Sequence, residues 1–280
     1  MKKCLYVRPC YHEILEMILD KRNECNVNRW TQGIDERPTL FVIRGSTGIG
    51  KSTFLSFVIG CTRHIFKNFA LFYSGNDNTT PDGQPISSEV FCHVMHEGKV
   101  VLHGYYADVN LKLRDSYLSK MDLILMDGCS MPLGATTRFK GVLIVAASPS
   151  LYVGNLTKII VDQCFVTMPA LELQESYEIA DIIEVGHNVV DDNWRYMGGI
   201  TRYLFEPGFA KEKVDQSLSE VNTSTITQMM SMQQARGETN LMVHSLVLWK
   251  TGTDLTEDPK FELVSPYVEK MVAKKLARET

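Results

Sequence analysis

The chain has few of the features that mark secreted, membrane-bound or strongly charged proteins. Its seven cysteines are scattered and include no Cys-x-x-Cys pair. We therefore expect neither a disulfide framework nor a structural zinc site, and we expect a reducing, intracellular compartment. No apolar run approaches the roughly 20 residues that span a bilayer, which argues against a membrane partner. The net charge of −4 gives no overall attraction to nucleic acid or anionic lipid.

What the sequence does contain is a globular composition and a regular succession of apolar segments. Hydrophobic residues make up 44% and charged residues 22% of the 280 positions, which suits one large or two smaller domains. Short apolar runs between polar turns predict strands, and apolar residues at helical spacing predict helices. The predicted strands cover residues 39–43, 70–74, 90–96, 99–106, 123–126, 142–147, 165–169, 241–251 and 261–264. The predicted helices include residues 11–19, 54–59, 111–118, 171–182 and a final helix from about Pro266.

A glycine-rich loop lies between the predicted strand 39–43 and the predicted helix 54–59. Glycines let the backbone curve so that its N–H groups line a concavity, and the following helix adds the positive end of its dipole. In such a phosphate-binding loop Lys51 would reach the β- and γ-phosphates of a nucleotide, the Ser52 hydroxyl would ligate Mg²⁺, and Thr53 is a first-turn helix residue. A plain turn is the alternative, but a turn requires neither lysine nor serine at these offsets. The loop consists of Gly45, Ser46, Thr47, Gly48, Ile49, Gly50, Lys51, Ser52 and Thr53.

A carboxylate stands at the end of the apolar run 123–126. Asp127 would lie at the carboxyl end of a buried parallel strand, which is where ligands bind in doubly wound α/β sheets. In that place Asp127 would hold Mg²⁺, directly or through water, beside Ser52. The alternative is an aspartate that caps a turn before Gly128.

Two further residues are candidates for sensing the nucleotide. Ser148 follows the predicted strand 142–147, and some ATPases insert a strand between the loop strand and the carboxylate strand. In those ATPases a polar residue at this tip senses the γ-phosphate, although Pro149 leaves a plain turn open.

Two consecutive glycines permit a tight turn before Arg202, which we expect to start a helix. A fixed arginine near the γ-phosphate would stabilise transferred charge or report the nucleotide state. The alternative is a structural arginine paired with a neighbouring acid.

The predicted hairpin between residues 90 and 106 contains metal-ligating residue types. Strand alternation puts Cys92 and His93 on opposite faces, so one site would have to choose between them. We therefore favour ordinary strand side chains over a metal site. The residues in question are Cys92, His93, His96 and His103.

A set of short motifs follows a fixed order along nearly the whole chain. It comprises Tyr6-Val7-Arg8-Pro9-Cys10-Tyr11, the glycine-rich loop, Leu125-Met126-Asp127-Gly128, Ala147-Ser148-Pro149-Ser150, Thr167-Met168-Pro169 with Leu173 and Glu175, Gly198-Gly199-Ile200-Thr201-Arg202-Tyr203, and Val264-Ser265-Pro266-Tyr267-Val268. This ordered set resembles the Crinkler effectors, and the retrotransposon-hot-spot (RHS) proteins of trypanosomes share much of it.

The resemblance implies an AAA-like or STAND-like ATPase module, which in many family members precedes a nuclease-like domain and works inside a nucleus. Nucleic acid as a partner, and the nucleus or a host cell as the location, are therefore expectations from the resemblance alone. The chain contains neither the secretion region of oomycete Crinklers nor a nuclease-like domain, so we do not carry over host delivery or DNA cleavage to these residues. Many hydrolytic ATPases place a catalytic glutamate directly after the strand-tip aspartate, where this chain has Gly128. Water activation would then come from elsewhere, or hydrolysis would be slow.

These observations together predict an α/β fold, a three-layer P-loop NTPase with a mainly parallel, AAA/STAND-like sheet and a smaller, mostly helical C-terminal subdomain. Residues 1–190 are predicted to form the nucleotide-binding domain, and residues 191–280 a lid or regulatory subdomain. The predicted activity is ATP hydrolysis with ATP and Mg²⁺ as ligands, and its catalytic residues are Lys51, Asp127, Ser148 and Arg202.

Other functions remain open at this stage. A nucleotide-binding switch or interaction module with little turnover, acting through a protein partner or self-association, is the main alternative. A GTPase is disfavoured because the sequence has no Asn-Lys-x-Asp motif. A small-molecule kinase stays possible because the polar loop from Gly75 would suit a substrate lid.

Overall fold

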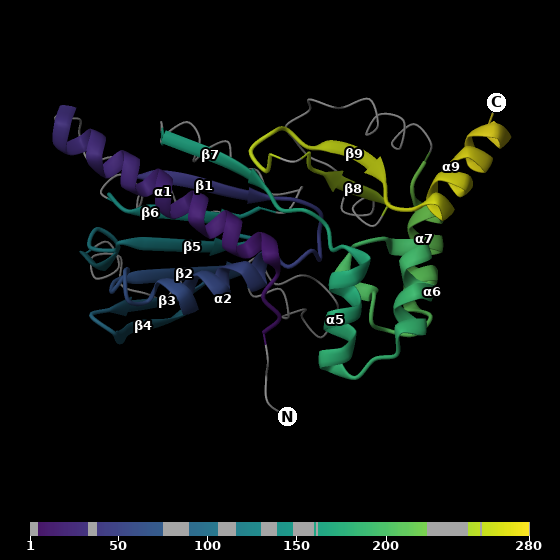
Figure 1. Cartoon of the computed structure of the whole chain (residues 1–280), viewed down its shortest axis with the longest axis horizontal. Coiled ribbons are helices and arrows are strands. Elements are labelled where there is room, and N and C mark those ends of the chain that lie inside the picture. The colour runs from purple at the N-terminus through teal and green to yellow at the C-terminus, as the bar shows by residue number, and fades with distance from the viewer. Residues whose placement is uncertain are drawn as a thin grey trace.

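The computed structural model describes residues 5–32, 38–74, 90–105, 116–129, 139–147, 160, 162–222, 246–252 and 254–279. The helices are α1 (Pro9–Gln32), α2 (Lys51–Thr62), α5 (Leu173–Ile183), α6 (His187–Met197), the 3-10 turn η3 (Thr201–Tyr203), α7 (Phe209–Glu220) and α9 (Pro266–Glu279). The strands are β1 (Thr39–Arg44), β2 (Phe69–Ser74), β3 (Val90–His96), β4 (Lys99–Tyr105), β5 (Leu123–Asp127), β6 (Val142–Ala146), β7 (Asp162–Thr167), β8 (Val247–Lys250) and β9 (Lys260–Leu263). Figure 1 shows their arrangement.

The large sheet of the described chain has the strand order β4-β3-β2-β5-β6-β1-β7. The five strands from β2 to β7 in this order are parallel, and the antiparallel hairpin β3–β4 extends the sheet beyond β2. Strand β6 therefore lies between β1, which precedes the glycine-rich loop, and β5, which ends in Asp127. The predicted three-layer α/β fold of a P-loop NTPase is confirmed by this topology.

Both faces of the central strands are covered, as their continuous apolar sequences require. Phe41 and Ile43 of β1 belong to the core on one face of the sheet. The apolar side of α1, which includes Tyr11, Ile14 and Ile18, packs into the same core. Helix α2 packs on the same face, as Figure 1 shows. The residues that alternate with these along β1 enter a second core on the opposite face. The loop after β1 therefore begins at the end of a strand that is buried on both faces.

A separate core holds the C-terminal part together. Helices α6, α7 and α9 and the hairpin β8–β9 enclose a cluster that includes Met197, Val214 and Val268. Helix α5 packs on α6 through a smaller cluster around Ala180 and Val190. This mostly helical unit lies beyond the carboxyl ends of the parallel strands (Figure 1). The predicted division at residue 190 stays a prediction, and that position falls within α6.

The hairpin β3–β4 turns at Glu97 and Gly98, both of which have positive φ. Cys92 is buried in the core on one face of the sheet. His93 instead lies opposite His103, with 3.0 Å between their Nδ1 atoms, and burial followed by the charge of His103 lowers the pKa of His93. The predicted placement of Cys92 and His93 on opposite faces is confirmed.

The region around Arg202 differs from the expectation. Arg202 starts no α-helix, because residues 201–203 form only the turn η3 and α7 begins at Phe209. Pro207 lacks a backbone N–H and Gly208 adopts a left-handed φ of 76°, so the chain cannot continue helically between the two elements. Of the predicted strand 241–251, residues 241–245 lie outside the described chain, as do the polar loop from Gly75 and the predicted helix positions before residue 116.

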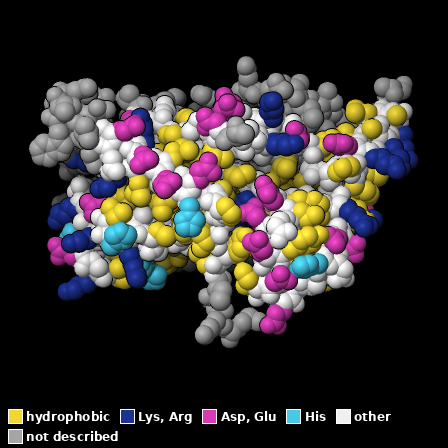
Figure 2. Space-filling model, in the orientation of Figure 1, with side chains coloured by type: hydrophobic (Ala, Val, Ile, Leu, Met, Phe, Trp, Pro, Cys, Tyr) yellow, Lys and Arg dark blue, Asp and Glu magenta, His cyan; other side chains and the backbone are white. Residues whose placement is uncertain are grey.

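The surface carries both signs of charge. On the face that Figure 2 shows, acidic and basic side chains are interspersed, and basic side chains gather at the end where α9 lies. In α9 the Lys275 ammonium donates hydrogen bonds to the carbonyl oxygens of Leu218 and Val221, which ties this helix to the end of α7. None of the described helices is both long enough and apolar enough to cross a membrane.

Candidate functional site

The glycine-rich loop connects the buried strand β1 to helix α2 in a conformation that needs glycine at two close contacts. Gly48 has φ 73°, and a Cβ on it would lie 2.9 Å from the Cβ of Arg202. Gly50, the residue before α2, has φ 98°, and a Cβ there would lie 2.5 Å from the Tyr11 hydroxyl oxygen. L-residues with side chains rarely adopt these φ values. The strand–loop–helix context that the motif predicts is therefore present.

Lys51 is the first residue of α2 and folds back onto the loop. Its Nζ donates hydrogen bonds to the carbonyl oxygens of Gly45, over 2.8 Å, and Ser46, over 2.6 Å. The residue is only 8% exposed. Burial lowers its pKa to about 8; the charge of Arg202 adds to the lowering, and the carboxylate of Asp127 opposes it. At neutral pH the loop therefore contains a buried cation that an anionic ligand would stabilise.

Ser52 and Asp127 are brought together from α2 and the tip of β5. The Ser52 hydroxyl donates a hydrogen bond to Asp127 Oδ1 over 2.9 Å. Ser52 is exposed and Asp127 is half-buried, so both oxygens are open to solvent. The alternative of an aspartate that only caps the Gly128 turn does not account for this contact, because the carboxylate points to the loop helix.

Arg202 lies beside the loop although it belongs to the C-terminal unit. The Thr201 N–H donates to the carbonyl oxygen of Gly48 over 3.0 Å, which docks the turn η3 onto the loop. The charge of Arg202 acts on Lys51, and the residue is exposed. Within the described part of the chain Arg202 forms no ion pair. A structural arginine paired with a described acid is therefore not what the geometry shows.

Ser148 lies outside the described residues, so its predicted sensing role stays a prediction. The described chain reaches Ala147, whose N–H donates to the carbonyl oxygen of Ile43 over 2.9 Å. The tips of β6 and β1 are thus adjacent just before the loop begins.

The remaining loop residues contribute to its shape. Ile49 is 1% exposed and anchors the loop in the core. Thr53 lies in the first turn of α2, as predicted. Burial raises the pKa of the nearby Tyr11 hydroxyl to about 12. Thr47 is half-buried.

Three contacts to the loop come from residues to which the sequence assigned no role. The Ser46 hydroxyl accepts a hydrogen bond from the backbone N–H of Trp249 in β8 over 2.9 Å. The Tyr11 hydroxyl donates to the Gly50 carbonyl over 2.7 Å, and Arg8 donates to the Ile49 carbonyl over 3.0 Å. The sequence could have indicated Arg8 and Tyr11, because both belong to a motif on which the family resemblance rests. No sequence pattern indicated Trp249.

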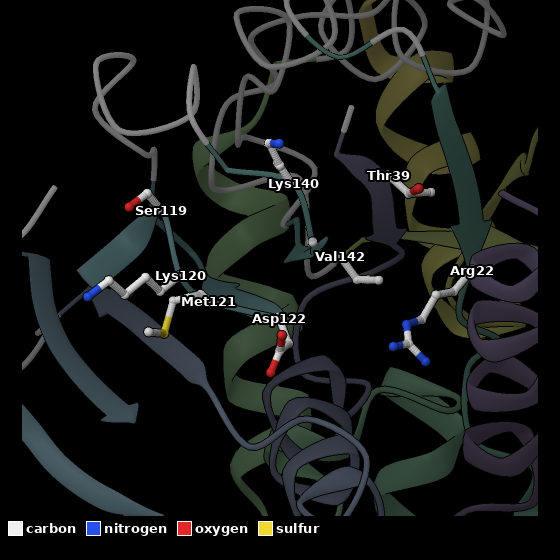
Figure 3. Close-up of a pocket in the computed structure, with 9 residues that line it drawn as sticks. Arg22, Thr39, Ser119, Lys120, Met121, Asp122, Lys140 and Val142 are labelled. Carbon is white, nitrogen blue, oxygen red and sulfur yellow. The ribbon is translucent and has the colours of Figure 1, made fainter. Parts of the chain in front are cut away.

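A cavity of about 270 Å³ lies elsewhere, at the amino ends of the parallel strands. It is lined by residues that include Arg22, Thr39, Asp122 and Lys140, and by no residue of the glycine-rich loop. Figure 3 shows its lining side chains, in which the amino groups of Lys120 and Lys140 diverge. Because nucleotides bind at the carboxyl ends of such sheets, this cavity is not the candidate nucleotide site.

The strand order and the loop between β1 and α2 define the class of the protein as a P-loop NTPase fold. No family model matches the chain, and no curated protein matches it. Similar solved structures include two of the Aeropyrum pernix ORC2 protein, one of its ADPNP–ADP complexes and one of its ADP form. The first is 12% identical, with a TM-score of 0.39, and the match covers 99% of this chain and 97% of that one. The second is 12% identical, with a TM-score of 0.41, and the match covers 97% of each chain. The strand order of the sheet and the loop after β1 define the fold class.

Proposed function

We propose that this protein binds ATP with Mg²⁺ at the glycine-rich loop and hydrolyses it to ADP and phosphate to drive a conformational switch. The observation that carries the proposal is the pairing of Ser52 with Asp127 at 2.9 Å, next to the buried ammonium of Lys51. A carboxylate and a hydroxyl at the entrance of a phosphate-binding loop, together with a cation inside it, are the set that a metal–triphosphate ligand requires.

The donor set of Ser52 and Asp127 fits Mg²⁺. Mg²⁺ prefers oxygen ligands about 2.0–2.1 Å away in octahedral geometry, so neighbouring ligands lie about 2.9 Å apart. The observed separation of the two oxygens is 2.9 Å. When bound, Mg²⁺ would neutralise part of the phosphate charge and so favour attack by water.

The chain's own residues would divide the remaining tasks. The N–H groups of the loop and Lys51 would hold the phosphates, and Arg202 would approach the γ-phosphate from the C-terminal unit. Ser148 would sense the same phosphate. In hydrolysis, water would form a bond to the γ-phosphorus while the bond to the β,γ-bridging oxygen breaks, which releases phosphate and ADP.

We also propose that residues 191–280 act as a lid or regulatory subdomain over the nucleotide-binding domain 1–190. Two contacts between the parts support it, from Thr201 to Gly48 and from Trp249 to Ser46. Both reach the loop itself, so a nucleotide that changes the loop would change how the C-terminal unit docks.

Assignment to the Crinkler/RHS type is part of the proposal and rests on the ordered motifs. A reducing intracellular location rests on the seven scattered cysteines, and placement in a nucleus or a host cell rests on the resemblance. Contact with nucleic acid rests on the same resemblance, whereas a protein partner or self-association belongs to the switch alternative. ATP is preferred to GTP because the sequence has no Asn-Lys-x-Asp motif.

A nucleotide-binding switch with little turnover is the second candidate, and one observation favours it. Gly128 follows Asp127 with a left-handed φ of 61°, where many hydrolytic ATPases have a catalytic glutamate. Without that carboxylate, the water needs another base or attacks slowly.

A turnover assay with ATP and GTP, with and without Mg²⁺, decides between the two candidates. The proposed ATPase predicts Mg²⁺-dependent phosphate release from ATP that is lost in both Lys51→Ala and Asp127→Asn. Tight ATP binding without phosphate release would select the switch. Hydrolysis that survives both substitutions would refute the proposed site.

A further inference from the structure

Arg8, in the segment just before α1, is a buried arginine whose hydrogen-bonding capacity is fully used. Only 3% of the residue is exposed, and a guanidinium has five N–H donors. Nε and Nη2 donate to the two carboxylate oxygens of Glu175 over 3.0 Å each. Nη1 donates to the carbonyls of Ile49 and Pro169, and Nη2 also donates to the carbonyl of Ala170, over 2.9–3.0 Å. Five donors thus meet five acceptors.

These acceptors come from three separate parts of the fold. Ile49 belongs to the glycine-rich loop, Pro169 and Ala170 follow β7, and Glu175 lies in the first turn of α5. Glu175 also accepts the N–H of Glu172 and so closes the capping box of α5. Arg8 therefore joins the loop to the helix that begins the C-terminal helical unit.

The contact with Ile49 bears on the loop's conformation. Loops that bind phosphate present their N–H groups to the ligand, so their carbonyls must be held elsewhere. Arg8 holds the carbonyl of Ile49, and the Tyr11 hydroxyl holds that of the next residue, Gly50. Two successive peptide groups of the loop are thereby anchored by the N-terminal segment.

We propose that Arg8, with Glu175 as its counter-ion, is a positioning residue that orders the glycine-rich loop for nucleotide binding. The inference rests on the proposed function for its ligand, ATP. Lysine cannot replace Arg8, because an ammonium has three donors without the planar fork that matches a carboxylate. A loop that must be ordered during binding binds more weakly than one that is ordered in advance.

The test combines hydrogen exchange of the loop amides with ATP affinity in the whole chain. The variants are Arg8→Lys and Glu175→Gln, which keeps Arg8 and the shape of the side chain but removes the negative charge. Arg63→Lys, at an exposed arginine after α2, is the matched control. We expect amides 45–50 to exchange about tenfold faster in apo Arg8→Lys, and its dissociation constant for Mg²⁺-ATP to rise about tenfold. Glu175→Gln should change both in the same direction, and Arg63→Lys should change neither.

A merely structural role predicts a different result. The melting temperature of the variants would fall while loop exchange and ATP affinity of the folded protein stayed at the parent's values, and that outcome would overturn the inference. If Arg8→Lys does not fold, Glu175→Gln tests the inference through the same two measurements, loop-amide exchange and ATP affinity. If the parent binds no ATP, the proposed function fails, and the exchange measurement still decides whether Arg8 orders the loop.

Discussion

The Ser52 hydroxyl lies 2.9 Å from Asp127 Oδ1, although 75 positions separate the two residues in the sequence. The contact depends on strand order, because only β6 lies between β5 and β1. The carboxyl ends of these three strands are aligned in the sheet. The start of α2 therefore meets the end of β5. The proposed metal site is a direct consequence of this topology.

Removing the Ser52 hydroxyl or neutralising the Asp127 carboxylate is expected to weaken the contribution of Mg²⁺ to ATP binding. Ser52→Ala and Asp127→Asn should each reduce the gain in ATP affinity on adding Mg²⁺ by about 10–100-fold. Titrations with Mg²⁺ and with EDTA measure the gain. Ser56→Ala, at an exposed serine in the next turn of α2, should keep the parent's gain. An undiminished gain in both site variants would exclude the pair as metal ligands.

ATP affinity is expected to fall as pH rises above about 8. Burial, aided by Arg202, lowers the pKa of Lys51 to about 8, and only the protonated form attracts phosphate. Bound phosphate raises that pKa, so affinity is full below pH 8 and falls by up to about tenfold per pH unit above it. Dissociation constants between pH 6.5 and 9.5 test this. Lys51→Met should bind weakly and without this pH dependence, whereas a flat profile in the parent would contradict the assignment.

Arg202 is expected to distinguish ATP from ADP. It lies beside Gly48 of the glycine-rich loop, and it is exposed, so we expect its charge to act on the terminal phosphate. Loss of one charge-assisted hydrogen bond should reduce ATP affinity about tenfold, with ADP affinity nearly unchanged. Arg202→Ala should show this difference in competition titrations, and Arg195→Ala, an exposed arginine of α6, should not. Equal losses for ATP and ADP would mean that Arg202 only supports the fold.

A side chain at Gly48 is expected to disrupt the loop. In Gly48→Ala the new Cβ would meet the Cβ of Arg202 at 2.9 Å at a φ of 73°. We expect a loss of ATP binding and a lower melting temperature. Gly60→Ala is the matched control, because a Cβ there meets nothing within 4 Å. In that helix it should stabilise the protein by about 0.5–1 kcal/mol. Full ATP affinity in Gly48→Ala would show that the described loop conformation is not the binding one.

The sequence predicted the elements of the sheet well because its central strands are buried on both faces and appear as unbroken apolar runs. The run 123–126 and its terminal Asp127 became β5, and the loop after residues 39–43 became the turn into α2. The helix expected at Arg202 did not form, because Pro207 and Gly208 interrupt it. The local pattern of apolar and turn-forming residues was sufficient to predict an element wherever that element depends on its own residues.

Contacts between distant segments were beyond what patterning could give. The hydrogen bond between Trp249 and Ser46 joins positions 203 apart, and that between Arg8 and Glu175 joins positions 167 apart. Neither residue pair has a spacing that a helix or strand would impose. The anchoring of the loop by Arg8 and Tyr11 became visible only once the N-terminal segment was seen packed behind it.

Nucleotide binding at the glycine-rich loop can be measured directly by calorimetry with a slowly hydrolysed ATP analogue in the presence of Mg²⁺. The parent chain and Lys51→Ala are compared at pH 7, where Lys51 is charged. We expect saturable binding with one site per chain in the parent and an affinity at least about 100-fold lower in Lys51→Ala. Equal affinity in the two proteins, or no binding to the parent, would contradict this expectation.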